Sequence, residues 1–439
     1  MTKGRIDIIS LGCSKNLIDS ERLMRRLDAK GYKVAHDSES PEGEYVVVNT
    51  CGFIADAKTE SIEMLLTLSE AKKNGIIGKI VVMGCLSERY MNELKEEMPE
   101  IDIWYGKFNW KEFVESLPDK KCSRESEVSS KPADWERTLT TPPWSAYLKI
   151  SEGCNRFCAF CAIPLITGRH TSRPVEEILS EVTQLVSEGV KEFNIIAQDL
   201  SSYGLDISGK HLLPELIDRM AMIPGVEWIR LHYAYPADFP MEILDVMNRH
   251  SNVCKYIDIA LQHISDPVLN NMRRHISREE TLNLIREMRR CVPDLKIRTT
   301  LMVGFPGEGD AEFDELMDFV KEMRFDRMGA FAYREEEGTW GAEHLDDNIS
   351  DEVKEERLDR LMKLQEDIAF DLNEEMIGKK VRVLIDRIEG DTAVGRTQWD
   401  SPEVDPEIFV KGFGDSKPGD FIEVEITASD YYDLLGKRI

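Results

Sequence analysis

The stretch KISEGCNRFCAFCAIPLITGRH, residues 149–170, places three cysteines within eight residues directly after an expected β-strand. Cys154, Cys158 and Cys161 have the spacing Cys-x-x-x-Cys-x-x-Cys. Thiolates bind soft metal centres, so this spacing indicates either zinc or an iron–sulfur cluster. A structural zinc ion needs a fourth ligand, for which His170 is close in sequence. A cubane cluster held by three cysteines instead leaves one iron open to a small molecule.

Outward from this stretch, short apolar strands alternate with helical patterns. The expected strands are AYLKI (146–150), FNIIA (193–197), EWIRLH (227–232), YIDIAL (256–261), KIRTTLM (296–302) and RMGAFA (327–332). Strands that alternate with helices in this way form βαβ units with a parallel sheet. Six units are too few for a closed eight-stranded barrel. The sequence therefore predicts an open, partial (βα)6 barrel over residues 144–372.

The remaining sequence predicts two smaller domains and a linker. Before the barrel, the runs RIDIISLGC, YVVVNTC and KIVVMGC are typical of buried parallel strands, and helical patterns separate them. Residues 1–120 are therefore predicted to form a doubly wound α/β domain. Residues 121–143 are polar and without period, which indicates a linker. Residues 373–439 contain short strands with turn signals and predict a small all-β, OB-like barrel.

Three further cysteines end the apolar runs of the first domain. Cys13, Cys51 and Cys85 each come just after an expected strand. If these strands are parallel neighbours, the three side chains converge at the carboxyl edge of the sheet, where open α/β sheets bind ligands. The alternative is three separate buried cysteines. The other cysteines lack this context and are predicted not to be ligands: Cys122, Cys254 and Cys291.

Composition limits the classes of function. The 439 residues include 82 acidic and 56 basic side chains, a net charge of −26. Such a chain is a poor general binder of phosphate backbones and suits a basic protein partner, although solubility alone also explains the charge. No apolar run approaches the roughly 20 residues that span a bilayer. An odd number of cysteines, nine, without a secretion signal favours a cytoplasmic location and thiols or metal ligands over disulfides.

The cysteine motif, with Phe160 just before its last cysteine, resembles that of the radical S-adenosylmethionine superfamily. This resemblance implies that Cys154, Cys158 and Cys161 hold a [4Fe–4S] cluster whose open iron binds the amino and carboxylate groups of S-adenosylmethionine. Reduction then yields methionine and a 5′-deoxyadenosyl radical. The resemblance also places Phe160 beside the adenine, and ordinary packing of this ring is the alternative.

With a second cysteine trio and a C-terminal β domain, the chain resembles the methylthiotransferases from end to end. That resemblance implies a second [4Fe–4S] cluster on Cys13, Cys51 and Cys85, which carries the sulfur and methyl group to be inserted, and a C-terminal domain of TRAM type. Two S-adenosylmethionine molecules are implied, one as methyl donor and one as radical source. A one-electron reductant such as flavodoxin or ferredoxin is also implied. Replacing C–H by C–S at an unactivated carbon needs such cofactors, because acid–base side chains cannot do it.

Several stretches resemble the branch of this family that modifies an aspartate of ribosomal protein uS12. They are IIAQDLSSYG (195–204), IRLHYAYP (229–236) and DIALQHISDPVLNNMRR (258–274). Gly309 stands where a threonine is usual, which weakens any role for that side chain. We therefore expect insertion of a methylthio group at the β-carbon of an aspartate in uS12. The alternatives are a tRNA adenosine methylthiotransferase and, in another class, a non-enzymatic ribosome-associated metal-binding protein.

The charge of the C-terminal domain bears on the choice of substrate. Residues 374–439 contain 15 acidic and 9 basic side chains, a net charge of −6. A tRNA-binding barrel should carry a basic stripe, so this charge makes tRNA an unexpected partner and suits a basic ribosomal protein. The alternative is that the charge only keeps a surface solvated.

A last group of residues lies at strand ends and in the GFPG stretch at 304–307. Those predicted to contact the cofactor, besides Phe160, are Gln198, Gln262, Arg298, Gly304 and Gly307. Buried structural glutamines are an equal alternative for the first two. For Arg298, whose guanidinium could also meet the target aspartate, the alternative is a plain ion pair. Weaker candidates for shaping the site are Asp199 and Tyr203, whereas a structural role is expected for His232 and His263.

Overall fold

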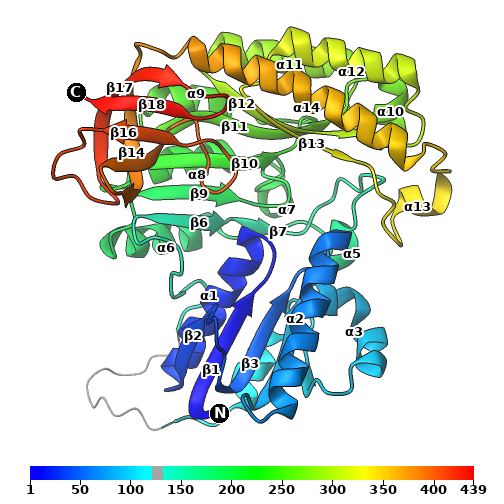
Figure 1. The fold of residues 1–439 in the computed structure, drawn as a ribbon, viewed down its shortest axis with the longest axis vertical. Coiled ribbons are helices and arrows are strands. Elements are labelled where there is room, and N and C mark those ends of the chain that lie inside the picture. The colour runs from blue at the N-terminus through cyan, green and yellow to red at the C-terminus, as the bar shows by residue number, and fades with distance from the viewer. Residues whose placement is uncertain (121–131) are drawn as a thin grey trace.

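The computed structural model describes residues 1–120 and 132–439, which form three β-sheet cores (Figure 1). Figure 1 shows the N-terminal sheet, in blue, below a larger six-stranded sheet, with the C-terminal barrel, in red, at one end of the latter. Residues 121–131, which include Cys122 and the first half of the predicted linker, lie outside the described residues. No helix in the described ranges is long and apolar enough to cross a membrane.

The N-terminal sheet is parallel, with the strand order β2-β1-β3-β4-β5. Its strands are β1 (Thr2–Ser10), β2 (Lys33–His36), β3 (Gly43–Thr50), β4 (Lys79–Gly84) and β5 (Ile103–Trp104). Helices α1 (Ser14–Ala29) and α4 (Trp110–Ser116) pack on one face, and α2 (Ala55–Lys73) and α3 (Cys85–Glu97) pack on the other. The predicted doubly wound domain is confirmed, with the short edge strands β2 and β5 added to the three that the sequence indicated.

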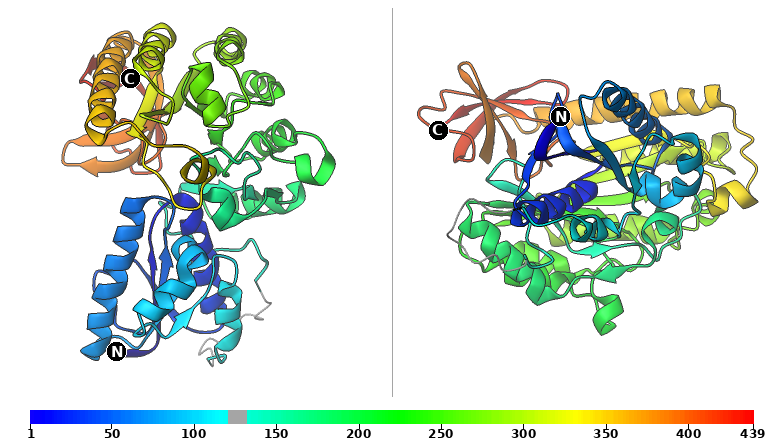
Figure 2. Two further views of the ribbon diagram at one scale, coloured as in Figure 1. Left: turned by 90° about the vertical axis from the view of Figure 1, so that its right-hand side faces the viewer. Right: turned by 90° about the horizontal axis from the view of Figure 1, so that it is seen from below.

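The six-stranded sheet is also parallel, with the order β13-β12-β11-β10-β9-β6. Its strands are β6 (Ser145–Lys149), β9 (Glu192–Ile196), β10 (Trp228–Ala234), β11 (Val253–Gln262), β12 (Lys296–Val303) and β13 (Arg327–Ala332). Its main helices are α6 (Val175–Ser187), α8 (Leu213–Ala221), α9 (Glu242–Arg249), α11 (Arg278–Cys291), α12 (Asp310–Met323) and α14 (Asp351–Glu374). Figure 2, left, shows these helices as a layer outside the sheet. The predicted open, partial (βα)6 barrel is confirmed.

Short elements lie in the loops of this barrel. They are the antiparallel pair β7 (Ser151–Glu152) and β8 (Thr171–Ser172), and the helices α5 (Ile163–Thr167), α7 (Leu205–Ser208), α10 (Asp266–Asn271) and α13 (Trp340–His344). Most of these segments follow the carboxyl ends of strands. This is the end of a parallel barrel at which loops build active sites.

The C-terminal domain is a closed barrel in the order β14-β15-β16-β18-β17. Its strands are β14 (Lys380–Glu389), β15 (Thr392–Thr397), β16 (Ile408–Lys411), β17 (Phe421–Ser429) and β18 (Leu434–Arg438). The predicted all-β barrel is confirmed, and β18 is a strand that the sequence did not indicate. The ring of Phe421 packs edge-on against Trp228, and Arg396 pairs with Glu192. Because Glu192 and Trp228 begin β9 and β10, this domain covers the amino ends of the barrel strands.

The described part of the predicted linker runs between the two α/β domains. Arg137 lies there with its side chain only 1% exposed. It pairs with Glu21 of α1 at 2.6 Å and with Glu181 of α6 at 2.8 Å. The segment therefore fixes the N-terminal domain to the barrel through buried charges.

Candidate active site between two cysteine trios

The first cysteine trio occupies the loop between β7 and α5, beyond the carboxyl end of β6. Cys161 N donates a hydrogen bond to Cys158 O at 3.0 Å, which closes a tight turn between these two cysteines. Just before Cys154, Gly153 has a φ of +78°, and a Cβ atom there would lie 2.2 Å from the carbonyl oxygen of Arg169. Only glycine fits this position, so the backbone itself holds the loop in shape.

Hydrogen-bond donors surround the sulfur atoms of this trio. Arg274 Nη1 lies 3.3 Å from Cys158 Sγ, and the backbone N–H of Arg156 donates to Cys154 Sγ over 3.5 Å. The guanidinium of Arg274 also stacks over Tyr235, 4.1 Å from the ring centroid. Burial raises the pKa of the Cys154 thiol to about 12. A metal cation among the sulfurs is what would hold such a thiol in the ionised, ligating form.

The second trio lies at one edge of the N-terminal sheet, because Cys13, Cys51 and Cys85 follow the neighbouring strands β1, β3 and β4. Gly12, with a φ of +89°, permits the close approach, since a Cβ atom there would lie 2.8 Å from Cys51 Sγ. Asn16 connects the loops. Its Nδ2 donates to backbone carbonyls at the ends of β1 and β3, both at 3.1 Å, and its Oδ1 lies 3.5 Å from Cys85 Sγ.

A row of charges, which sequence reasoning missed, connects the second trio with the barrel. Lys107 Nζ lies 3.1 Å from Asp19 Oδ2, and Asp19 Oδ1 accepts from Lys149 Nζ at 2.6 Å. Lys149 also pairs with Glu152 at 2.9 Å, and Glu152 accepts a hydrogen bond from the amide of Gln198. Burial opposes the charge on Lys107, but Asp19 and Glu152 outweigh burial and raise its pKa well above the usual value.

The position of Lys107 is the signal that could have revealed it. Lys107 follows β5 by three residues, at the same carboxyl edge as the three cysteines. The positive charge of Lys107 favours the ionised form of two of the thiols. Together with Lys15 and the backbone N–H of Asn16, it lowers the pKa of Cys13 against the effect of burial. The edge therefore combines three thiols with a permanent buried cation.

Both trios lie next to the contact between the N-terminal domain and the barrel, which we call the seam. At the seam, Cys85 packs against Ala162 and Ile166, the first of which directly follows Cys161. Arg89 of α3 pairs with Glu336, in the segment after β13 of the barrel, at 2.6 Å. Figure 1 shows α5 and β7 between the N-terminal sheet and the barrel. Both trios therefore border one region of the molecule.

Two glutamines predicted to contact the cofactor present unpaired oxygens near this region. Gln198 Oε1 and Gln262 Oε1 are buried without a hydrogen-bond partner among the described residues. Gln262 also has a φ of +72°, which is unusual for a residue other than glycine. Buried polar atoms are normally satisfied, so a water molecule or a ligand is expected to complete the hydrogen bonding of these acceptors. Phe160 packs at 6.2 Å from Phe305, edge to face, within the same barrel mouth.

Close packing explains why glycine stands at both ends of the GFPG stretch. A Cβ atom on Gly304 would lie 2.3 Å from Lys354 Cγ, and one on Gly307 would lie 2.4 Å from Asn271 Nδ2. These contacts bring α14 and α10 close to the loop after β12. A contact of either glycine with the cofactor stays a prediction.

The side chain of Arg298 points to the end of the barrel that the C-terminal domain covers. Its Nη1 lies 2.8 Å from Asp405 Oδ1, in the loop between β15 and β16, and its Nε lies 3.8 Å from Asp258 Oδ1. Tyr256 donates to the other oxygen of Asp405 at 2.7 Å. The structure thus gives Arg298 an ion pair with the C-terminal domain, which was the alternative to a cofactor contact.

The weaker candidates have partners of their own. Asp199 Oδ2 accepts from Arg156 at 2.7 Å, and the hydroxyl of Tyr203 donates to a backbone carbonyl at 2.8 Å. His263 pairs with a buried glutamate at 3.0 Å, and burial lowers the pKa of His232 well below its usual value. These two histidines therefore have the surroundings of structural residues.

The donors of both trios are cysteine thiols, the ligand type of iron–sulfur clusters. Within residues 1–120 and 132–439, no group of three or more His, Cys, Asp or Glu side chains is arranged to hold one metal ion. His170, the candidate fourth zinc ligand, is buried with Nε2 3.1 Å from Ser172 Oγ. In a cubane each thiolate binds a different iron, so three thiols need not converge on one point. Iron–sulfur ligation by the two cysteine trios stays a prediction.

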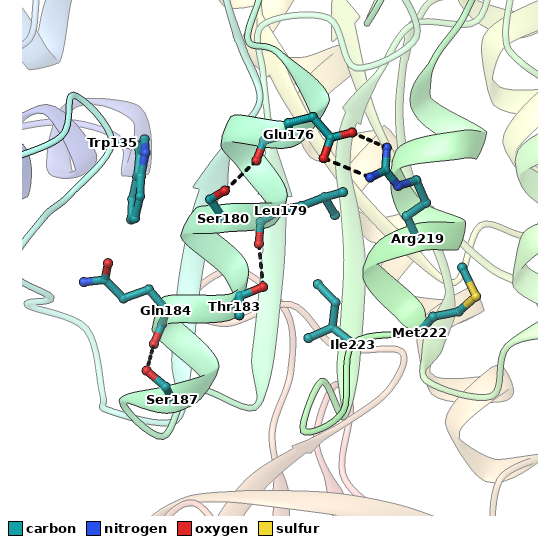
Figure 3. Close-up of a pocket in the computed structure, with 10 residues that line it drawn as sticks. All are labelled: Trp135, Glu176, Leu179, Ser180, Thr183, Gln184, Ser187, Arg219, Met222 and Ile223. Carbon is teal, nitrogen blue, oxygen red and sulfur yellow. Dashed lines mark hydrogen bonds and ion pairs between the residues drawn. The ribbon is translucent and has the colours of Figure 1, made fainter.

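A separate cavity of about 740 Å³ opens on the helical layer, and no cysteine of either trio lines it (Figure 3). It lies between α6 and α8 and is bordered by Trp135, Glu176 and Arg219. Glu176 and Arg219 form a bidentate pair at 2.7 and 3.0 Å, so the main charges of this cavity satisfy each other. It lacks the cysteines and unpaired acceptors that mark the seam.

Comparison with known families divides the chain into three matched regions. Residues 148–320 match the Radical SAM superfamily, residues 5–106 match the uncharacterized protein family UPF0004, and residues 377–439 match the TRAM domain. The chain is 60% identical over 435 residues to the ribosomal protein uS12 methylthiotransferase RimO of Phocaeicola vulgatus, covering 99% of both chains. It is 46% identical to the protein of the same name from Flavobacterium johnsoniae, covering 100% of this chain and 98% of the relative.

Solved structures share the fold at low sequence identity. The radical S-adenosylmethionine methyltransferase TsrM from Kitasatospora setae, with cobalamin and a [4Fe-4S] cluster bound, matches with a TM-score of 0.56 at 15% identity. The match covers 78% of this chain and 74% of TsrM. The cobalamin-dependent enzyme OxsB, with S-adenosylmethionine bound, matches with a TM-score of 0.52 at 14% identity, over 83% of this chain and 56% of OxsB. Both likenesses concern the arrangement of the elements.

Proposed function

This chain belongs to the family of ribosomal protein uS12 methylthiotransferases, RimO, and on that premise we propose that it inserts a methylthio group at the β-carbon of an aspartate in uS12. As a radical S-adenosylmethionine methylthiotransferase, it is an enzyme, which sets aside the non-enzymatic alternative. The finer points of the proposal are the two clusters, the two S-adenosylmethionine molecules and the carbon that is modified.

The observation that carries the proposal is the presence of two cysteine trios on one seam. In this proposal Cys154, Cys158 and Cys161 hold one [4Fe–4S] cluster, and the trio that begins with Cys13 holds the other. When bound, the clusters and S-adenosylmethionine supply one-electron chemistry that can remove hydrogen from an unactivated carbon, and a sulfur to join to that carbon. Both needs concern the same carbon atom, so both trios must border the space in which the substrate lies.

The chain's own residues bind, orient and balance charge. In this proposal the oxygens of Gln198 and Gln262, which have no partner among the described residues, accept hydrogen bonds from S-adenosylmethionine. The guanidinium of Arg274 beside Cys158 and the ammonium of Lys107 near the second trio offset the negative charge of thiolate-bound clusters. We propose that one S-adenosylmethionine provides the methyl group and another the radical, with electrons from flavodoxin or ferredoxin, in the cytoplasm where uS12 is made.

The C-terminal domain favours a protein substrate over tRNA. Its excess of acidic residues would repel phosphate, although barrel arginines neutralise part of it. Asp400 pairs with Arg327 at 2.7 Å and Asp405 pairs with Arg298 at 2.8 Å. The acidic surface that remains suits a basic ribosomal protein.

The test is anaerobic reconstitution with iron and sulfide, followed by incubation with S-adenosylmethionine, a reductant and purified uS12. The wild-type protein should form 5′-deoxyadenosine, and the mass of uS12 should rise by that of one methylthio group less the hydrogen that it replaces on one aspartate. Cys154→Ala should abolish both products, whereas Cys13→Ala should retain 5′-deoxyadenosine and lose the methylthio product. Cys291→Ala, which removes a cysteine of the outer helical layer, is the matched control and should keep both. Methylthiolation of tRNA with unchanged uS12 would show that the tRNA branch is correct.

A further inference from the structure

Lys15 reaches from the N-terminal domain to the barrel. It stands in the first turn of α1, two residues after Cys13. Its Nζ lies 3.5 Å from the centroid of the Tyr233 ring, which belongs to β10 of the barrel. A cation over an aromatic face is held in place by the ring quadrupole. Lys15 thus crosses the seam beside the second trio.

Tyr233 is held in a strained conformation that presents its ring to this lysine. Its φ is +63°, although it is not glycine and lies in a strand. Its backbone N–H donates to Asp258 Oδ2 at 3.3 Å, and its side chain is 39% exposed. Backbone strain of this kind persists where the surroundings enforce it and clusters at functional sites. Tyr233 lies in the IRLHYAYP stretch, and the proposed function gives it no role.

Lys15 has no carboxylate partner among the described residues, in contrast to three other cations near the trios. Lys107 and Lys149 pair with Asp19, and Arg156 pairs with Asp199. Over the described ranges, Lys15 Nζ has no hydrogen bond or ion pair. A half-buried ammonium stacked only on an aromatic ring is free to accept an anionic partner from outside the chain.

We propose that Lys15, positioned by Tyr233, binds the carboxylate of the side chain to be modified and so selects aspartate as the target. The inference rests on the proposed function. An aspartate carries its carboxyl group directly on the β-carbon. When that carbon lies between the two trios, the carboxylate must therefore lie in the seam as well. The carboxylate of S-adenosylmethionine offers the same chemistry, but Lys15 stands beside the Cys13 trio rather than beside the loop of Cys154, Cys158 and Cys161.

The test compares two uS12 peptides, one with the target aspartate and one with asparagine in its place. Wild-type protein, Lys15→Met and Lys15→Arg are reconstituted anaerobically, and Kd is measured for each peptide and for S-adenosylmethionine. KM and kcat for methylthiolation follow. Lys33→Met, an exposed lysine on β2, is the matched control.

Loss of a charge-assisted contact should weaken binding of the aspartate peptide about 10- to 100-fold in Lys15→Met. Binding of the asparagine peptide should change little, so the preference for aspartate disappears. Lys15→Arg should restore most of the preference, and Lys33→Met should keep all of it. Because the ratio between peptides does not depend on the fraction of protein loaded with clusters, partial loading does not hide the result.

Two outcomes would overturn the inference. A Lys15→Met variant that still prefers aspartate by the wild-type ratio shows that the carboxylate binds elsewhere. A variant that loses affinity for S-adenosylmethionine and keeps the peptide preference assigns Lys15 to the cofactor. If the wild-type protein modifies neither peptide nor intact uS12, the proposed function fails instead, and the two failures are distinguishable.

Discussion

Glu192 joins the barrel to the C-terminal domain, and its replacement by glutamine should loosen that domain. The side chain is fully buried. Its Oε1 and Oε2 accept from the two terminal nitrogens of Arg396 at 2.8 and 2.9 Å, and Ser145 Oγ donates to it at 2.6 Å. Arg230, also fully buried, completes the cluster as a second cation. The carboxylate of Glu192 therefore pairs with both guanidinium groups.

The size of the effect follows from burial. Glu192→Gln keeps the shape of the side chain and removes its charge, which leaves two buried cations facing a neutral amide. Breaking a buried pair in this way costs about 3–5 kcal/mol. Arg396 retains Asp386 at 2.7 Å, so the lower end of the range, about 3 kcal/mol, is expected. The matched control is Glu407→Gln, which breaks an exposed bidentate pair with Arg387 in the same domain and should cost about 0–1 kcal/mol.

Amide hydrogen exchange of β14 and β17 measures the opening of this domain directly. A loss of about 3 kcal/mol should lower the protection of these amides about 150-fold in Glu192→Gln, with one order of magnitude for each 1.36 kcal/mol. In Glu407→Gln, protection should fall about fivefold at most. Equal protection in the two variants would show that the buried carboxylate does not hold the domain in place.

The same cluster predicts a response to acid. Burial favours the neutral carboxyl, but Arg396 and Arg230 outweigh burial and hold the pKa of Glu192 far below its usual range. Its contribution to the free energy of unfolding is therefore complete above the ordinary glutamate pKa of about 4.3 and is lost as the pH falls below it. Wild-type protection of β14 and β17 should fall in that window, and that of Glu192→Gln should fall less.

Three further changes test other parts of the molecule. Burial raises the pKa of Asp258 to about 6, so its contribution to stability is lost as the pH rises from about 4 through 6. The free energy of unfolding of Asp258→Asn should therefore exceed that of the wild type by about 2–3 kcal/mol above pH 7 and differ little at pH 4. Thermal melts that show the same difference at every pH would contradict this cause. Lys107→Met removes the cation near the second trio, so it should lower the iron content after reconstitution from about eight to about four atoms per chain. The exposed control Lys111→Met should keep the wild-type iron content, and equal iron content in the two variants would contradict the role of Lys107. Gly12→Ala places a Cβ atom 2.6 Å from Cys51 Cβ at a φ of +89°, a strain of about 1–3 kcal/mol. Both the iron content and the melting temperature should therefore fall. A variant in which neither changes would show that the loop adapts.

The arrangement of cysteines could be predicted from the sequence because it depends on chain direction. Cys51 and Cys85 directly follow apolar strands that alternate with helices, and parallel strands deliver their carboxyl ends to one edge. The short strands β2, β5 and β18 escaped prediction. A strand of two to five residues at an edge or in a small barrel carries too few apolar positions to show a period.

Partners that belong to different domains could not be predicted in the same way. Arg298 was expected at the cofactor, and its ion pair with Asp405 depends on how the C-terminal domain covers the barrel. Lys107 and Asp19 are 88 residues apart and meet only because β5 and α1 lie on the same sheet. Such pairs depend on packing between elements, which the local sequence pattern does not determine.

The placement of the two α/β domains is itself part of the proposed chemistry. Removing hydrogen from a carbon and joining sulfur to the same carbon require both reacting groups to approach one atom to about 3–3.5 Å, and an error of about 1 Å costs about a hundredfold in rate. Buried Arg137 ties α1 to α6, and Arg89 ties α3 to Glu336, so ion pairs of low exposure fix the N-terminal domain to the barrel. A chain with six intact cysteines but a loosened seam would therefore cleave the cofactor without placing sulfur on the substrate.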